Sequence, residues 1–165
     1  MGRSTYLVAL GSNRAGRHGR PRDEIAAALR LLGGRASPVV ASAPLGPSMR
    51  TFANAAVLID TDESPTGLLA RLKRIEQAFG RRTGRRWGAR VIDLDIILWS
   101  GGRVTSRTLT VPHPAFRYRA FVLTPARSIA ATWRDPVTGR TVRHLHSRLT
   151  ARRPSRSARE HCWGP

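Results

Sequence analysis

The order of the predicted elements indicates an α+β fold with a ferredoxin-like βαββαβ core, in which helices pack on an antiparallel sheet, followed by C-terminal additions. Apolar runs and amphipathic segments follow one another in the order strand, helix, strand, strand, helix, strand. The chain has 165 residues, of which 41% are hydrophobic, and this is sufficient for one domain with its own core. We expect a single domain over residues 1–149 and a disordered tail, rich in Arg, Ser and Pro, over residues 150–165.

The first half of the chain predicts one helix and three strands. Apolar runs that are bounded by glycine, proline or polar clusters are typical of strands. These runs are residues 6–10, 36–43 and 52–61. The helix opens at Pro21 and closes at Gly33, because proline suits the first turn of a helix and glycine ends it. Its apolar face consists of Ile25, Ala28, Leu29 and Leu32.

The second half predicts another helix and the most strand-like run of the chain. Ser64 and Pro65 form a cap and a first turn, and the apolar stripe that follows ends at Gly80. This stripe consists of Leu68, Leu72, Ile75 and Phe79. The strand covers residues 91–99. The C-terminal additions are a turn at 100–103, a proline-bearing segment at 111–114, an apolar stretch at 121–129 and a hairpin that turns near 135–139.

The composition narrows the class of protein. A formal net charge of +19 fits a polyanionic partner, but Lys73 is the only lysine among 29 basic residues, which leaves 28 arginines. Codon bias produces such a skew without selection for RNA, so we expect no nucleic-acid partner. No apolar run reaches the roughly 20 residues of a membrane span, and the N-terminus lacks a signal-peptide layout. Since Cys162 is the only cysteine, a cytoplasmic protein without disulfides or a cysteine-based zinc site is expected.

Two aspartates in the last predicted strand give the sharpest chemical signal. Side chains two residues apart share one face of a strand, so Asp93 and Asp95 project together, while Leu94, Ile96 and Leu98 project into the core. Two ionised carboxylates on an apolar strand are costly unless a cation compensates them. Mg²⁺ binds oxygen ligands and keeps phosphate and water as its other ligands. The pattern predicts a magnesium clamp, and a structural acid pair neutralised by arginines is the alternative.

The segment before this strand, residues 80–90, combines three glycines with five arginines. Glycines give hinge freedom and arginines bind phosphates, so the segment is interpreted as a mobile lid over a phosphate site. A solvated basic loop has the same composition and is the alternative interpretation.

Several short motifs occur in an order and spacing that resemble one family. They are Ala9-Leu10-Gly11-Ser12-Asn13, Pro44-Leu45-Gly46-Pro47, Phe52 with Asn54-Ala55-Ala56, Ile75-Glu76, Arg86-Trp87-Gly88-Ala89-Arg90-Val91-Ile92-Asp93-Leu94-Asp95-Ile96, Val111-Pro112-His113-Pro114, and Arg119-Ala120-Phe121-Val122-Leu123. Together they closely resemble the 6-hydroxymethyl-7,8-dihydropterin pyrophosphokinase family over about residues 5–130. The RWG-x-R-x-x-DLDI string is the most specific of them.

The resemblance implies an enzyme of folate biosynthesis that transfers pyrophosphate from MgATP to the hydroxymethyl group of 6-hydroxymethyl-7,8-dihydropterin, giving AMP and the pterin diphosphate. It implies two Mg²⁺ ions on Asp93 and Asp95, and two phosphate-binding arginines, Arg81 and Arg90. The implied pterin-binding residues are Ser42, Ala43, Leu45, Phe52, Asn54 and Phe121, with the two phenylalanines stacked on the ring. The implied ATP-binding residues are Glu76, Ile96, Thr110, His113 and Arg119.

Other interpretations stay open from the sequence. Phe52 and Phe121 could be core aromatics rather than stacking platforms. The arginines also fit a ferredoxin-like RNA-binding module, and Gly11-Ser12 with an Asp-x-Asp strand also occurs in nucleotidyltransferases, although at a shorter spacing. Departures from the family pattern allow an impaired paralogue; they lie at Ser42, Thr108, Tyr118 and residues 126–131. We expect a monomer.

Overall fold

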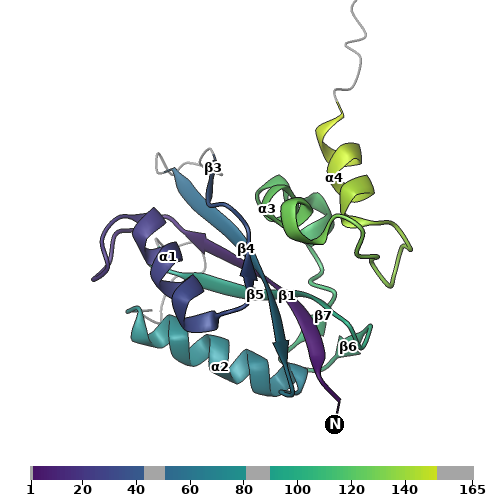
Figure 1. Ribbon diagram of the computed structural model, residues 1–165, viewed down its shortest axis with the longest axis horizontal. Helices are drawn as coiled ribbons and strands as arrows, with labels where there is room; N and C mark the ends of the chain where they lie inside the picture. Colours follow the sequence, from purple (N-terminus) through teal and green to yellow (C-terminus); the bar gives the residue numbers. More distant parts are fainter. Residues whose placement is uncertain (1, 43–50, 81–89, 152–165) are drawn as a thin grey trace, which may run out of the picture.

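The computed structural model describes residues 2–42, 51–80 and 90–151, and its elements follow the predicted order (Figure 1). The strands are β1 (Ser4–Ser12), β2 (Arg35–Ala36), β3 (Val40–Ser42), β4 (Phe52–Thr61), β5 (Asp93–Trp99), β6 (Val104–Thr105) and β7 (Thr110–Val111). The helices are α1 (Pro21–Leu32), α2 (Pro65–Ala78), α3 (Ala120–Ala130), α4 (Val142–Thr150) and the short 3₁₀ helix η1 (Phe116–Tyr118).

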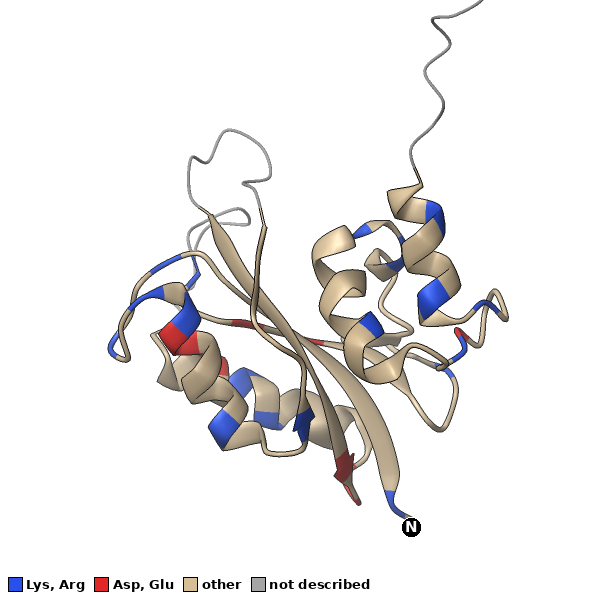
Figure 2. Ribbon diagram, turned by 45° about the horizontal axis from the view of Figure 1, so that its top comes forward, with Lys and Arg blue, Asp and Glu red and all other residues tan. Residues whose placement is uncertain are grey.

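The main sheet has the strand order β2-β4-β1-β5. Strand β3 also pairs with β4, on the same edge as β2 but nearer to the start of β4. Its strands are all antiparallel. Helices α1 and α2 lie on one face of the sheet and helices α3 and α4 on the other (Figures 1 and 2). The predicted α+β, ferredoxin-like architecture is confirmed, with the C-terminal additions forming a third layer. None of the helices in the described ranges is long and apolar enough to cross a membrane.

Each face of the sheet has its own core. The side chains Val8, Leu10, Leu94 and Ile96 pack with α1 and α2, in what we call the α1–α2 core. The side chains Leu7, Ala9, Ile97 and Leu98 pack with α3 and α4, in the α3–α4 core. Alternation along β1 supplies both cores, since successive strand residues point to opposite faces.

The helix signals are confirmed in detail. The Ser64 hydroxyl caps α2 by accepting a hydrogen bond from the Gly67 amide at 3.2 Å. Helix α1 begins at Pro21 and is followed by Gly33, whose φ of 67° lies in the left-handed region that glycine tolerates.

The strand predicted over residues 36–43 is wrong as a single element, because it is broken between β2 and β3. Pro38 lacks an amide hydrogen and cannot donate to the neighbouring strand. At this point Ser37 makes the hydrogen bonds to β4 instead. The Ser37 amide donates to the Ala56 carbonyl at 2.8 Å, and the Ser37 hydroxyl accepts from the Ala56 amide at 2.9 Å. The predicted residue Ala43 lies outside the described residues.

Strand β5 contains a β-bulge that the alternation did not predict. Val8 pairs with Ile96, but the preceding residue Leu7 pairs with Leu98, so Ile97 is the extra residue. The prediction that Leu98 shares a core with Leu94 and Ile96 is therefore wrong. Leu98 points into the α3–α4 core, because one inserted residue reverses the faces beyond it.

The C-terminal additions are only partly as predicted. The apolar stretch at 121–129 forms α3, and the hairpin turn near 135–139 is present, with a bridge between Arg134 and Thr141. Helix α4 was not predicted; it ends at Thr150, the first residue of the predicted tail, and residues 152–165 lie outside the described residues.

A buried ion pair joins this hairpin to η1. The Arg117 guanidinium donates to both carboxylate oxygens of Asp135, with each N–O distance 2.7 Å. Asp135 is fully buried, and it also accepts from the Thr138 hydroxyl at 2.6 Å and the Val137 amide at 3.1 Å. Burial raises the pKa of this carboxyl, but the hydrogen bonds from Arg117, Thr138 and Val137 outweigh it and lower the pKa to about 2.

The first prediction concerns this pair. Asp135→Asn leaves the Arg117 charge unpaired and should reduce the free energy of unfolding by about 3 kcal/mol at neutral pH. Because the folded-state pKa of Asp135 is lowered, its stabilisation is present above pH 4 and is lost as the pH falls towards 2. Urea unfolding from pH 7 to pH 2.5 should show the difference between wild type and variant shrink. Asp62→Asn, at an exposed aspartate, is the matched control, and a difference that does not change with pH would contradict the assignment.

Candidate active site

The two predicted aspartates lie together on β5 and face the α3 side of the sheet. They line a small cavity of about 50 Å³ that opens to solvent. The residues around it are Ala9, Leu10, Gly11, Asn54, Asp93, Asp95, Arg119, Phe121 and Val122. These residues come from β1, β4, β5 and the first turn of α3, which are distant in sequence. The prediction that Asp93 and Asp95 project together is confirmed.

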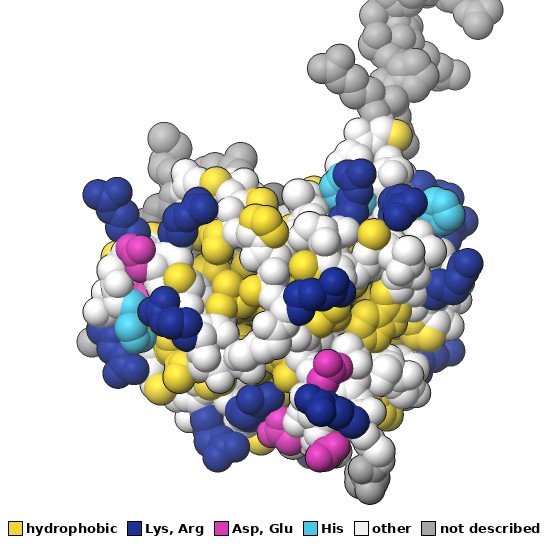
Figure 3. All heavy atoms as spheres, viewed as in Figure 1, with side chains coloured by type: hydrophobic (Ala, Val, Ile, Leu, Met, Phe, Trp, Pro, Cys, Tyr) yellow, Lys and Arg dark blue, Asp and Glu magenta, His cyan; other side chains and the backbone are white. Residues whose placement is uncertain are grey.

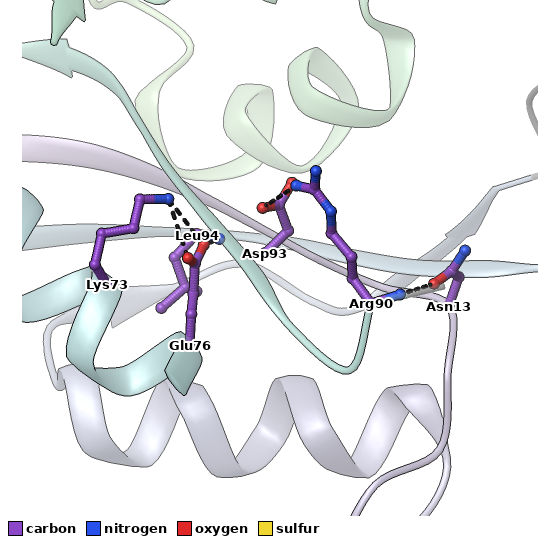
Figure 4. Close-up of polar contacts among 6 residues, drawn as sticks. All are labelled: Asn13, Lys73, Glu76, Arg90, Asp93 and Leu94. Carbon is purple, nitrogen blue, oxygen red and sulfur yellow. Dashed lines mark hydrogen bonds and ion pairs between the residues drawn. The ribbon is translucent and has the colours of Figure 1, made fainter. Parts of the chain in front are cut away.

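Arg90 contacts one of the two aspartates. Its Nη1 lies 2.7 Å from Asp93 Oδ1, and both side chains are about one third exposed (Figure 4). The Arg90 backbone is held by Asn13, whose Oδ1 accepts from the Arg90 amide at 2.8 Å. The second carboxylate oxygen of Asp93 has no ion pair within the described ranges, and neither has Asp95. Arginines of the described part of the chain therefore neutralise the pair only partly.

Charge and burial act most strongly on Asp95. Burial raises the pKa of its carboxyl, and the negative charge of Asp93 raises it further. His113, Lys73 and Arg119 act in the opposite direction without cancelling the effect. An acid held in this way is poorly solvated when ionised, so a cation in the cavity would relieve both unfavourable contributions.

The donor set fits a hard divalent cation. Two carboxylates from one strand face, in a cavity open to solvent, leave room for phosphate and water as further ligands, which suits Mg²⁺. No group of three or more His, Cys, Asp or Glu side chains that could hold a metal occurs among the described residues. An all-protein metal cage is thus absent from this part of the chain, and the aspartate pair is suited to an ion that arrives with its own ligands.

A buried carboxylate on α2 holds the aspartate-bearing strand in place. Glu76 is fully buried, and its Oε1 accepts from the Leu94 amide at 2.8 Å (Figure 4). Lys73 Nζ lies 3.2 Å from Oε1 and 3.0 Å from Oε2 of the same carboxylate. The Leu94 amide lies between the two aspartates in sequence, so Glu76 fixes the backbone that carries them. The structure thus shows Glu76 in a supporting role within the fold. The family resemblance implied that Glu76 binds ATP.

His113 and Arg119 approach the aspartates from the segment after β5. The His113 amide donates to the Ile97 carbonyl at 3.0 Å, and its Nδ1 accepts from the Ala115 amide at 3.2 Å. With Nδ1 accepting, Nε2 carries the proton of the neutral ring and can donate to a ligand. Burial lowers the pKa of His113, the charge of Asp95 opposes this, and Arg119 adds to it. A mostly neutral imidazole is expected in this setting.

Of the described residues predicted to bind the pterin, two line the cavity and two do not. Phe121 and Asn54 line the cavity, and the Arg119 guanidinium carbon lies 5.7 Å from the Phe121 ring centroid. Phe52, half-buried at the start of β4, and Ser42 are not among the lining residues. Asn54 Nδ2 donates to Ser42 Oγ at 2.8 Å, and a Cβ built on Gly11 would lie 3.5 Å from Asn54 Oδ1. The amide oxygen of Asn54 therefore faces the cavity side.

The remaining predicted residues are placed as follows. The Ile96 side chain is buried in the α1–α2 core, on the face opposite to the aspartates, so only its backbone could contact a nucleotide. Thr110 is exposed on β7. Arg81, Ala43 and Leu45 lie outside the described residues, so their predicted roles, and the predicted lid, stay predictions.

The profile of one protein family, 7,8-dihydro-6-hydroxymethylpterin-pyrophosphokinase (HPPK), matches residues 7–131, which include most of β1, all of β2 to β5 and every residue around the cavity. The chain belongs to the HPPK family.

Individual HPPK relatives agree with this assignment. A 2-amino-4-hydroxy-6-hydroxymethyldihydropteridine pyrophosphokinase of Pseudomonas aeruginosa is 41% identical over 154 residues, covering 87% of this chain and 89% of the relative. Enzymes of the same name from Synechocystis and Methylorubrum extorquens are 40% and 46% identical. Those alignments cover 67% and 59% of this chain, but only 57% and 61% of the length of these two relatives.

Solved structures show the same fold. A crystal structure of Plasmodium falciparum HPPK-DHPS superposes with a TM-score of 0.68 at 13% identity, covering 89% of this chain and 45% of that chain. This likeness shows that the overall fold is shared.

Two residues that support the candidate site from outside the cavity were not recognised from the sequence. Asn13 belongs to the quoted Ala-Leu-Gly-Ser-Asn motif, but its contact with Arg90 spans 77 positions and has no local signal. Lys73 is the single lysine in a chain with 28 arginines, and this departure from the bias was the available signal. Its ammonium lies against Glu76, the residue that holds Leu94.

The second prediction concerns this support. Glu76→Ala leaves the buried Leu94 amide without its acceptor and removes the carboxylate beside Lys73, so the free energy of unfolding should fall by about 3 kcal/mol. Glu76→Gln keeps an acceptor oxygen and should recover part of that loss. Chemical denaturation of both variants measures this, with Gln77→Ala, at the exposed neighbouring position, as the control. Equal stability of wild type and Glu76→Ala would refute the role.

Proposed function

We propose that this chain transfers the pyrophosphoryl group of ATP to the hydroxymethyl oxygen of 6-hydroxymethyl-7,8-dihydropterin, releasing AMP. The observation that carries the proposal is the cavity that Asp93, Asp95, Asn54 and Phe121 line together, in a chain that belongs to the HPPK family. One wall is acidic and suits a metal-bound triphosphate. The other wall combines an aromatic ring with an amide and suits a flat heterocycle.

The reaction requires one bond to form and one to break. The pterin oxygen attacks the β-phosphorus, the bond between the β-phosphorus and the bridging α–β oxygen breaks, and the hydroxyl proton leaves to solvent. Asp93 and Asp95 would hold two Mg²⁺ ions, which offset the negative charge of the phosphates when bound. Arg90 and Arg119 add fixed positive charge on the same side of the sheet. Rate enhancement then comes mainly from the alignment of two bound substrates and the exclusion of water.

On the pterin side, the Asn54 amide is oriented before a ligand arrives. Because Nδ2 donates to Ser42 Oγ, Oδ1 is left as the acceptor for an N–H group of the heterocycle. Phe121 would stack on the ring, and its neighbour Arg119 would lie towards the phosphates. The predicted second platform, Phe52, would have to approach from the end of β4. Ala43, Leu45 and Arg81 are proposed to contribute as the family resemblance implies.

An RNA-binding module is not supported. Such modules expose aromatic side chains on an open sheet face, whereas both faces of this sheet are covered by helices and closed by the two cores. Basic side chains are scattered over the face seen in Figure 3 rather than gathered in one stripe. We also propose a cytoplasmic monomer, since MgATP is available there and one chain supplies both walls of the cavity.

The third prediction tests the proposed function. Purified protein with MgATP and 6-hydroxymethyl-7,8-dihydropterin should form AMP, and Asp95→Asn should lower kcat by about a hundredfold or more. Since burial and Asp93 raise the pKa of Asp95, its ionised form destabilises the fold, and the variant should melt at a higher temperature than wild type. Asp62→Asn is the control for both measurements. Full AMP formation by Asp95→Asn would contradict the metal role.

The fourth prediction concerns the pterin wall. Ser42→Ala removes the acceptor of Asn54 Nδ2, so the amide can rotate and the pterin KM should rise roughly three- to tenfold, the equivalent of one hydrogen bond. The KM for ATP should stay within twofold. Ser42→Thr keeps the hydroxyl and should restore the pterin KM. Steady-state kinetics with each substrate varied in turn distinguishes this from a general loss of active enzyme, which would lower kcat and leave both KM values unchanged.

A further inference from the structure

The backbone of Arg90 is held by one residue of the neighbouring segment, Asn13. Its amide donates to Asn13 Oδ1 at 2.8 Å (Figure 4). Its carbonyl accepts from the Asn13 amide at 3.2 Å. Asn13 directly follows β1, and Arg90 lies three residues before β5. The two hydrogen bonds therefore continue the β1–β5 connection beyond the last ladder pair, Gly11 with Asp93.

The loop that carries Asn13 is itself firmly anchored. Gly16 and Gly19 exchange backbone hydrogen bonds of 3.1 and 3.3 Å. The fully buried carboxylate of Glu24 accepts from the His18 amide at 2.7 Å, and its other oxygen lies 2.7 Å from His18 Nδ1. A Cβ built on Gly16 would lie 2.5 Å from Val91 Cγ1, so the loop packs directly against the residue after Arg90. Asn13 is thus presented from a rigid base.

The guanidinium of Arg90 depends on this backbone contact for its direction. It reaches Asp93 over an i,i+3 spacing, in a segment that precedes the strand. A residue outside regular structure has many backbone conformations, and most of them would direct the side chain away from Asp93. Asn13 does not line the cavity, and its two hydrogen bonds to Arg90 both go to backbone groups of Arg90.

We propose that Asn13 is a positioning residue for the transfer reaction: it holds the Arg90 backbone so that the guanidinium is set against Asp93 at the edge of the cavity. Its effect on turnover is exerted through Arg90 and not on either substrate. The catalytic consequence rests on the proposed function, whereas the contact itself does not.

A double-mutant cycle tests the dependence on Arg90. Asn13→Ala should lower kcat roughly three- to tenfold, the equivalent of one hydrogen bond, with the pterin KM within twofold of wild type. Asn13→Asp keeps an acceptor oxygen and should recover most of this loss. In an Arg90→Ala background, which retains the amide but lacks the guanidinium, Asn13→Ala should have less than a twofold further effect. Ala15→Ser, at an exposed position of the same loop, is the control.

A second measurement reads the contact without catalysis. In Asn13→Ala the backbone amide of Arg90, followed by NMR, should exchange with solvent at least tenfold faster, and in Asn13→Asp it should stay protected. An equal loss of kcat in both backgrounds, or unchanged exchange at Arg90, would overturn the proposal. If wild type forms no AMP while the exchange results hold, the proposed function fails and the positioning contact stands.

Discussion

The strand that carries both candidate magnesium ligands pairs with another strand along one edge only within the described residues, and the whole site depends on how its other edge is satisfied. Strand β5 pairs with β1, while Glu76 accepts the Leu94 amide and the His113 amide donates to the Ile97 carbonyl on the open side. An open edge would be free to fray or to pair with another chain. A buried carboxylate from α2 and the segment after β7 prevent this. The direction of the aspartates is therefore set by a helix and a loop as much as by the sheet.

The electrostatics of the site go against the stability of the fold. Asp93 and Asp95 are like charges on one face, and burial of Asp95 makes its ionised form less favourable still. A chain with a net charge of +19 could have neutralised both with arginine, but only one oxygen of Asp93 has such a partner in the described part of the chain. The incomplete pairing leaves acceptor oxygens for a cation. This is the pattern expected where a protein retains an unfavourable group for ligand binding.

The sequence predicted what local chemistry determines and missed what depends on distant contacts. The strand at residues 52–61, the cap at Ser64 and the shared face of Asp93 and Asp95 follow from period, capping and alternation. The break at Ser37 was foreseeable from Pro38, which cannot donate to a ladder. The bulge at Ile97 and the Asn13–Arg90 contact were not, since each is decided by the packing of segments far apart in the chain.

Because of the extra residue Ile97, strand β5 contributes side chains to the cores on both faces of the sheet. Before it, Leu94 and Ile96 face α1 and α2 while the aspartates face the cavity; after it, Leu98 joins the opposite core and Trp99 packs with the first. The face to which the carboxylates point is thereby set independently of the faces to which the anchoring residues beyond the bulge, Leu98 and Trp99, point. A one-residue insertion or deletion within the strand on one side of this point would turn either the acids or the anchoring residues to the wrong face of the sheet, whereas a change in length beyond the strand would leave both in place.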